Sequence, residues 1–314
     1  MAKQSKLNKT RSLQLDLLAM LLVPMLSSWY FYGPGAIRLI CISVITCVLC
    51  ELIGRRILKQ PSTVSDLSAV VTGILIALML PANAPVWLPV LGGMFAIFAA
   101  KLPFGFVENL PFSPAAASFA FLTICFPDLI FDYPRISALS TALSSTSSVS
   151  LTSMLAQNTS VSLRSVKALD ILVGNFPGPM GASCIIVLLG SAIYMLIRRT
   201  KLFVTTAGFL SGAALMAICF PRVTNLFSSL VLELCAGCMI FAAIFLITEQ
   251  STQPKHILSR LLYGFTAGVS CMLMRRFGAF EECVCFAVLI INAAWPVADK
   301  AFMKIINKRM KKSK

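Results

Sequence analysis

Ten long apolar runs, separated by short stretches rich in Pro, Gly and Arg, fill this chain almost from end to end. A helix that crosses the hydrocarbon core of a bilayer needs roughly 20 mostly apolar residues. The runs therefore predict an all-α integral membrane protein of about ten transmembrane helices. The third and fourth runs are short, so we expect those helices to be tilted, broken or extended through polar residues. The runs cover residues 13–33, 36–52, 67–80, 86–100, 115–130, 182–197, 202–220, 228–248, 257–274 and 283–297.

The composition agrees with a membrane protein and excludes several functions. The 314 residues are 58% hydrophobic and only 12% charged, whereas soluble domains are about a quarter charged. No Gly-rich phosphate loop, nucleophile motif or paired carboxylate set is present, so hydrolytic and kinase chemistry have no support. The single His256 has no Cys/His cluster around it in the sequence, and no metal site is predicted.

The net charge of +15 would suggest a nucleic-acid partner for a soluble protein. In a membrane protein, the excess of Lys and Arg in cytoplasmic segments explains it better. If the N-terminus is cytoplasmic and the spans alternate, 20 of the 27 Lys and Arg lie inside and 7 outside. This count predicts ten spans with both termini in the cytoplasm. Arg275 and Arg276 are the clear exception, and the neighbouring Glu281 and Glu282 offer a compensating charge.

A Ser/Thr-rich segment of about 50 residues divides the runs into two groups of five. Long loops in compact proteins are usually functional. Two halves with an odd number of spans would be inverted repeats, which place sites near the bilayer midplane. The predicted organisation is a basic N-terminus (1–12), a first five-helix half (13–130), an extracytoplasmic loop (131–180), a second five-helix half (181–299) and a basic cytoplasmic tail (300–314).

Five sequence blocks, in order, resemble the RnfD/NqrB membrane subunits of ion-translocating electron-transfer complexes. The second block is similar to the family pattern G-K-x-x-x-G…N-x-F-N-P-A, and the fourth to T-D-P-x-T-x-P. No single block is specific, but five in the family order are. The short N-terminal extension makes the chain more similar to RnfD than to NqrB. The blocks are 66–81 with 85–87, 101–115, 174–178, 248–254, and 282–292 with Pro296 and Asp299.

This resemblance implies a membrane subunit of an Rnf-like complex that couples flavin-mediated electron transfer to translocation of Na⁺ or H⁺. It implies ten helices in two inverted halves, in the cytoplasmic membrane of a bacterium. It also implies FMN joined by a phosphoester to a Thr of the outside loop, a second, noncovalent flavin, and other membrane and soluble Rnf-like subunits as partners.

The outside loop departs from the family's D-x-x-S-G-A-T attachment pattern. An ungapped match places Ser153 at the acceptor position, and a shift by one residue makes Thr152 the acceptor. Leu151 and Thr152 then stand where the family has Gly and Ala, and bulkier side chains hinder close approach to the backbone. The acidic residue before the motif is also missing. A flavin-free structural subunit is therefore an alternative, as is a secondary transporter without a redox cofactor.

Four further residues are candidates for binding a flavin. Lys101 either extends its ammonium to the cytoplasmic surface, which we favour, or holds a flavin phosphate or an acidic lipid. Asn109 begins a segment with two prolines that is either a broken helix at membrane depth or an ordinary loop. Asn175 and Gly178 belong to a turn cluster before a helix start, where backbone N–H groups favour a phosphate, although a plain turn explains it equally well.

Three carboxylates lie in or next to the apolar runs, where ionisable residues are candidates for function. Glu233 is only about two turns from the start of its run, so an interfacial position is the simpler expectation. Glu249 could bind a cation or pair with Lys255 or Arg260, and Asp299 lies at the end of the last run.

Overall fold

The computed structural model describes residues 2–59, 67–104, 110–134, 152, 172–174, 177–222, 226–249, 251–278 and 282–312. Helices and the turns between them make up this part of the chain, and it contains no β-strand. The all-α prediction is therefore confirmed for the described residues.

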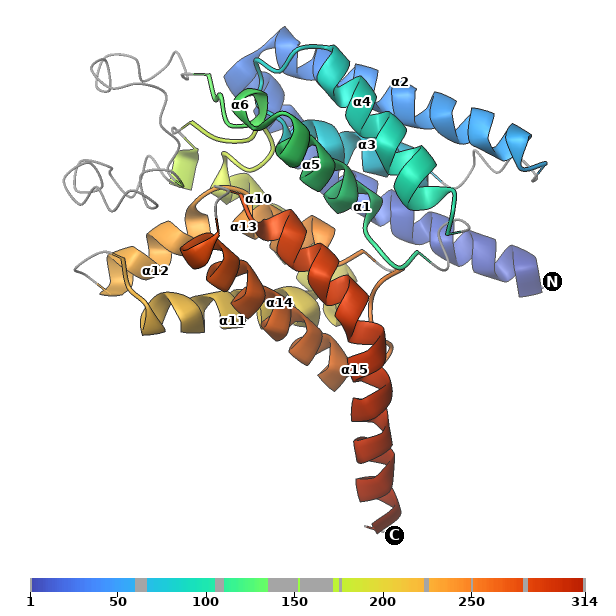
Figure 1. Ribbon diagram of the computed structural model, residues 1–314, viewed down its shortest axis with the longest axis vertical. Coiled ribbons are helices and arrows are strands. Elements are labelled where there is room, and N and C mark those ends of the chain that lie inside the picture. The colour runs from blue at the N-terminus through green and yellow to red at the C-terminus, as the bar shows by residue number, and fades with distance from the viewer. Residues whose placement is uncertain are drawn as a thin grey trace.

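The first half of the chain contains two long helices followed by shorter ones (Figure 1). The fourth apolar run is an α-helix that continues into a π-helix, and the fifth breaks at Phe126 into two helices. The elements are α1 (Ala2–Tyr32), α2 (Pro34–Ile57), α3 (Ser68–Met79), α4 (Trp87–Phe95), η2 (Ala96–Lys101), α5 (Pro114–Cys125) and α6 (Pro127–Ile130).

The second half contains three long helices, a shorter one and a broken one. The break separates α12 from α13, which continues as the π-helix η4. The elements are α10 (Ile185–Arg198), α11 (Thr200–Cys219), α12 (Leu226–Cys235), α13 (Met239–Phe241), η4 (Ala242–Leu246), α14 (Ile257–Phe277) and α15 (Val284–Lys312).

Each of the ten apolar runs contains at least one of these helices, but ten complete crossings are not confirmed. Five helices are long and apolar enough to cross a membrane unaided: 11–32, 34–57, 200–219, 257–277 and 284–304. The pair 229–235 and 239–246 qualifies as a sixth span if its two parts, bent by 63°, are counted together. Four further apolar helices have only 10–17 residues. Breaks and π-turns shorten the regular helices, and the sequence pattern does not show them.

The two halves lie side by side and meet along two pairs of helices. In Figure 1 the blue-to-green half lies above the yellow-to-red half, and the end of α15 projects away from the body. Helix α1 packs against α10, and α5 packs against α15. Polar contacts join the first pair: Arg199 Nε donates to Asp16 Oδ2 at 2.7 Å, and Ser28 Oγ donates to the carbonyl of Met180 at 3.0 Å.

Local sequence explains where several helices begin and end. Gly33 takes a left-handed φ of 70° between α1 and α2, a conformation that glycine adopts without strain. Pro34 then occupies the first turn of α2, where its missing N–H costs nothing. Ser113 caps α5, accepting a hydrogen bond from the Ala116 N–H at 3.4 Å, and Pro114 follows it in the first turn.

Glycines allow the closest helix contacts. On α11 and α14, Gly208, Gly212, Gly264 and Gly268 each lie against backbone atoms of the opposite helix, with no room for a β-carbon. In the first half, a β-carbon on Gly73 of α3 would lie 2.8 Å from the Cα of Val44 on α2. The expectation that residues around Gly73 permit close helix approach is thus confirmed. In membranes, small residues promote helix association by this route.

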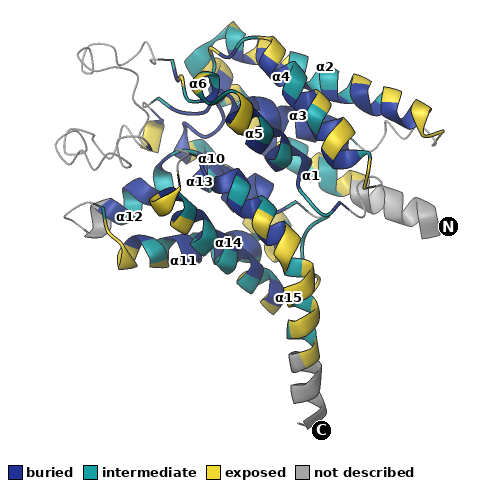
Figure 2. Ribbon diagram, viewed as in Figure 1, coloured by how far each residue is buried: buried dark blue, intermediate teal, exposed yellow. Residues whose placement is uncertain are grey.

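Helix α3 lies at the centre of the first half. All of its residues except Val70 are buried, which explains why this short helix is apolar on every side (Figure 2). The turn after the Ser/Thr-rich segment covers its C-terminal end. The N–H groups of Met180 and Gly181 donate to the carbonyls of Leu80 and Leu78, at 3.2 and 2.7 Å. This turn therefore satisfies carbonyls that the helix end leaves free.

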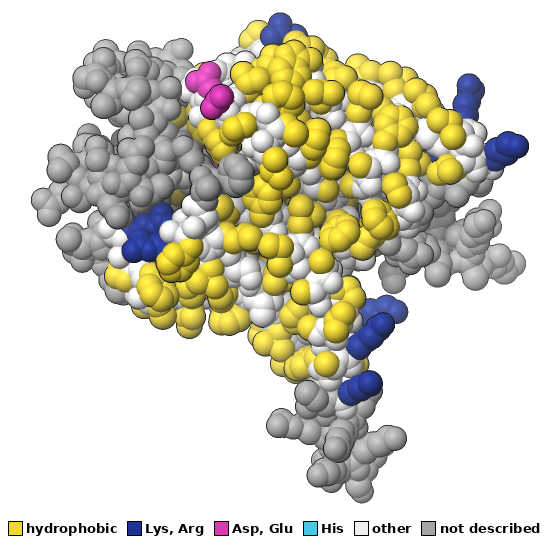
Figure 3. All heavy atoms as spheres, viewed as in Figure 1, with side chains coloured by type: hydrophobic (Ala, Val, Ile, Leu, Met, Phe, Trp, Pro, Cys, Tyr) yellow, Lys and Arg dark blue, Asp and Glu magenta, His cyan; other side chains and the backbone are white. Residues whose placement is uncertain are grey.

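The outer surface is mainly apolar. Figure 3 shows hydrophobic side chains over most of the visible face, with coloured Lys, Arg, Asp and Glu near its margins. Exposed residues such as Leu26, Ile45, Ile193 and Ile218 lie on the long helices. Exposed apolar area on this scale is typical of a surface in contact with lipid.

Candidate functional site

Three groups of buried polar side chains lie inside this apolar body. The first joins α2, η2 and the start of α3. Glu51 accepts hydrogen bonds from Arg55, one turn later on the same helix, including one of 3.0 Å from Nε. Its other carboxylate oxygen lies 2.6 Å from Lys101 Nζ, which also lies 2.6 Å from Ser68 Oγ. The carboxylate therefore contacts two cations inside the protein.

Lys101 does not extend to the membrane surface. It is 1% exposed, so the prediction that its ammonium reaches the cytoplasmic face is wrong. Lys101 is the last residue of η2, and π-turns are common at functional sites. The direction of its side chain depends on Glu51, which is 50 residues away in sequence and supplies the compensating charge.

Glu249 lies next to this first group but belongs to the second half. It follows η4, in the turn that begins at Ile247. Burial raises the pKa of the Glu249 carboxyl from 4.5 to about 7, against the opposing effects of the Ser113 hydroxyl and the Lys101 charge. Ser113 caps α5, so Glu249 of the second half meets two elements of the first. A carboxyl group in this environment can gain or lose a proton near neutral pH.

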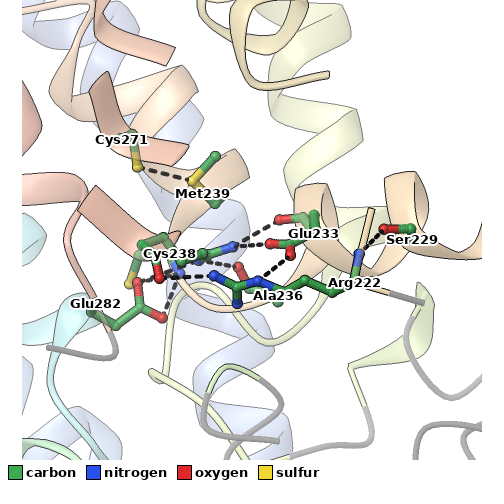
Figure 4. A network of polar contacts seen from close by, with 9 residues as sticks. Arg222, Ser229, Glu233, Ala236, Cys238, Met239, Cys271 and Glu282 are labelled. Atoms are coloured by element: carbon green, nitrogen blue, oxygen red, sulfur yellow. Dashed lines mark hydrogen bonds and ion pairs between the residues drawn. The ribbon is translucent and has the colours of Figure 1, made fainter. Parts of the chain in front are cut away.

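The second group surrounds the break between α12 and α13 (Figure 4). Gly237 takes a φ of 61° there, and the two helical pieces differ in direction by 63°. Backbone groups freed by such a break must find partners if no water is present. Arg275 of α14 donates to the carbonyls of Glu233 and Ala236, at 2.8 and 3.0 Å. Its guanidinium therefore serves both sides of the break.

Carboxylates complete this second group. The Cys238 N–H, just past the break, donates to both Glu282 oxygens at 3.2 and 3.3 Å. Glu233 Oε1 lies 3.2 Å from Arg222 Nε, and Glu233 Oε2 lies 3.6 Å from Arg275 Nη1. Glu282 is 3.9 Å from Arg275 Nη2, which confirms that Glu282 offsets the outer arginine pair.

Glu233 is not at a membrane interface. It is 1% exposed, so the interfacial prediction is wrong, because the bend turns this part of α12 into the protein. Arg222 lies in the turn before α12. Burial lowers the pKa of its guanidinium, and the negative charge of Glu233 opposes that effect.

The third group joins α14 and α15. The Tyr263 hydroxyl hydrogen-bonds to Asn292 Oδ1, and the ring of Tyr263 lies edge-on to Trp295 with centroids 5.5 Å apart. Asn292 Nδ2 and Trp295 Nε1 are buried donors without a hydrogen-bond partner. Nearby on the same two helices, Ser259 hydrogen-bonds to Asp299. The unsatisfied donors mark a place where a polar ligand could bind.

The candidate flavin residues fall in different places. Ser153, Asn109 and Asn175 lie outside the described residues. Thr152 is 4% exposed. The carbonyl of Gly178 accepts a hydrogen bond from the Tyr32 hydroxyl at 3.4 Å.

Lys101 and the turn that contains Gly178 lie at opposite ends of α3. Lys101 binds Ser68 at the start of the helix, whereas Gly181 binds the carbonyl of Leu78 near its end. One phosphate group cannot contact both regions.

Sequence reasoning missed Glu51 and Arg55 altogether. Their signal was an acid and a base four residues apart near the end of an apolar run, a spacing that places both on one helix face. Charged residues inside membrane helices usually face the protein interior and pair with one another, as these do.

Apolar helices with a lipid-like outer surface, a bent span and buried ion pairs define a multi-pass helical membrane protein of the ion- or solute-handling kind. The chain belongs to the NQR2, RnfD, RnfE family, whose sequence model matches residues 3–307.

Three relatives illustrate this membership, and each is the D-type component of a membrane complex. The one from the Na⁺-translocating ferredoxin:NAD⁺ oxidoreductase complex of Acetobacterium woodii is 27% identical, with 93% of this chain and 89% of the relative covered. The one from the proton-translocating ferredoxin:NAD⁺ oxidoreductase complex of Clostridium ljungdahlii is 26% identical, covering 86% and 83%. The one from an ion-translocating oxidoreductase complex of Ectopseudomonas mendocina is also 26% identical, covering 93% and 90%.

Proposed function

We propose that this chain is the D-type membrane subunit of an Rnf-like complex, which couples electron transfer through flavin to movement of Na⁺ or H⁺ across a bacterial cytoplasmic membrane. The observation that carries the proposal is the family match over residues 3–307, together with relatives that are D-type components of complexes moving either ion. Other membrane and soluble subunits of the same complex are its proposed partners.

The proposed topology has ten spans and both termini in the cytoplasm. Five long helices, one bent pair and four shorter apolar helices account for ten passages of the chain. Short helices can serve as spans where neighbouring protein covers their ends, as the turn at Met180 and Gly181 covers the end of α3. The distribution of Lys and Arg along the sequence supports the orientation.

For covalent FMN, Ser153 is the proposed acceptor and Thr152 the alternative. Thr152 is almost fully buried, so an attaching enzyme would reach its hydroxyl only after local opening. This burial favours the Ser153 alignment.

For the second flavin, the described residues that fit best are those of the Tyr263 group. A flavin ring system presents carbonyl and ring-nitrogen acceptors, and Asn292 Nδ2 and Trp295 Nε1 are buried donors without partners. Once bound, a flavin supplies one- and two-electron transfer. Asn292 and Trp295 would fix the orientation of the ring, and the apolar side chains around them would exclude water.

Ion coupling follows from charge. Negative charge added to a site of low dielectric constant strongly attracts a cation or a proton. Glu249 is the described carboxyl group best suited to take up a proton, since it titrates near neutral pH and lies between the two halves.

The first test is the flavin content of the purified protein. We expect a yellow preparation whose flavin absorption falls in Asn292→Ala, while Ser191→Ala on α10 leaves it unchanged. If flavin is covalent, fluorescence persists through denaturing electrophoresis and disappears in Ser153→Ala but not in Thr152→Ala. A colourless protein that still assembles with its partner subunits would support the flavin-free scaffold, and solute uptake by the chain alone in vesicles would support a transporter.

A further inference from the structure

The break between α12 and α13 places several oxygen acceptors around one positive charge. The carbonyls of Glu233 and Ala236 and the carboxylates of Glu233 and Glu282 all lie within 3.9 Å of the Arg275 guanidinium nitrogens (Figure 4). Carbonyls of an unwound helix and nearby carboxylates are the groups that bind alkali cations in membrane proteins with discontinuous helices. Here an arginine side chain lies among them.

The charges of this group balance only because Arg275 is present. Among the described residues it contains two guanidinium groups, Arg222 and Arg275, and two carboxylates, Glu233 and Glu282. Without Arg275 the group would carry one net negative charge inside an apolar body. One monovalent cation would restore neutrality, whereas a divalent cation would leave an excess positive charge.

The acceptors also retain unused capacity. Glu233 Oε2 is buried and has no hydrogen-bond partner, and Glu233 as a whole is almost completely enclosed. This oxygen lies 3.6 Å from Arg275 Nη1, beyond hydrogen-bonding distance. A buried carboxylate oxygen without a partner is unfavourable, and a small cation would satisfy it.

We infer that the break in this span is a monovalent-cation site that Arg275 occupies as a tethered cation in the state seen here. Removal of the Arg275 side chain opens the site to Na⁺ from solution. The inference depends only on the contacts around the break and is independent of the proposed flavin chemistry, so each can fail without the other.

The experiment measures thermal unfolding of the full-length purified chain in detergent, with choline chloride replaced stepwise by NaCl at constant ionic strength. A ligand that binds only the folded state raises the melting temperature as its concentration rises. We expect Arg275→Ala to melt lower than wild type in choline and to recover stability progressively with Na⁺. Wild type has its site filled and should show no such rise.

Two matched variants separate this site from general salt effects. Arg276→Ala removes the neighbouring, exposed arginine and should behave like wild type in both salts. In the Arg275→Ala/Glu233→Gln double variant the remaining charges balance. Loss of a carboxylate charge about 4 Å away weakens apparent sodium affinity on the order of a thousandfold, so the sodium response should disappear.

If Arg275→Ala does not fold in choline, its yield in the two salts becomes the measurement. Recovery of folded protein in NaCl supports the inference, and equal loss in both salts overturns it. A folded Arg275→Ala variant whose melting temperature ignores Na⁺ also overturns it, as does a response that persists in the double variant.

Discussion

The packing of α11 against α14 yields the most quantitative prediction. Gly264 of α14 lies against the carbonyl of Thr205 and the N–H of Phe209, so a β-carbon there would overlap backbone atoms. Gly190 of α10, in contrast, has no heavy atom within 4 Å of the place where a β-carbon would stand. The same Gly→Ala change can therefore be made once at a tight contact and once at an open, exposed position.

The expected magnitudes differ in sign. Overpacking costs typically 1–3 kcal/mol, and the upper end, about 3 kcal/mol, applies because backbone atoms cannot rotate away. Alanine recovers up to about 1 kcal/mol over glycine through helix propensity at both positions. Gly264→Ala should thus lose about 2 kcal/mol of unfolding free energy. Gly190→Ala should gain as much as about 1 kcal/mol, and less if the unfolded state in micelles is already helical.

The assay is equilibrium unfolding in mixed micelles with an increasing fraction of sodium dodecyl sulfate, followed by tryptophan fluorescence and circular dichroism. Additivity can be checked with Gly208→Ala, which overlaps the carbonyl of Leu261 from the opposite helix. If Gly264→Ala proves as stable as Gly190→Ala, the two helices do not approach as closely as described, and the explanation of this packing is wrong.

Three more predictions concern charge and thiols. Glu51→Gln leaves the buried Lys101 ammonium without its counter-charge and should cost about 3–5 kcal/mol in the same micelle assay, whereas exposed Asp128→Asn should change stability by no more than about 0.5 kcal/mol. The raised pKa of Glu249 means that the folded state holds a proton which the unfolded state releases, so wild-type stability should fall as pH rises from about 4.5 to about 7. Glu249→Gln should flatten this slope and melt higher than wild type at pH of about 8, and an unchanged slope would show that another group is responsible. All eleven cysteines are free thiols, so alkylation under denaturing conditions without reductant should label every one, and an unlabelled pair in mass spectrometry would contradict this.

Much of the helical framework could be predicted from the sequence. Each apolar run corresponds to at least one helix, and the Gly73 contact and the Glu282–Arg275 pairing were both readable from residue types and spacing. These features depend on local pattern, on the small size of glycine and on the need to neutralise a charge near lipid. All three properties are visible in one dimension.

The bends and the depth of the charged groups were not predictable in this way. The 228–248 run is continuous in hydropathy, so nothing but Gly237 indicates that the helix stops and turns there. Burial of Lys101 depends on Glu51, and the position of Glu233 depends on Arg275, 42 residues later. Pairings between residues so far apart are set by tertiary packing, and a single sequence does not contain them.

The contact between α1 and α10 has a consequence for biosynthesis. Asp16 finds its partner Arg199 only 183 residues later in the chain. At usual translation rates of about 5–20 residues per second, the first helix would wait roughly 10–40 s for this partner to emerge from the ribosome. During that interval a carboxylate near the membrane surface lacks its guanidinium, so the newly inserted N-terminal segment has to be sheltered by lipid headgroups or by the insertion machinery. The first five helices are then held in waiting rather than completed, and the molecule closes only when its second half is in the bilayer.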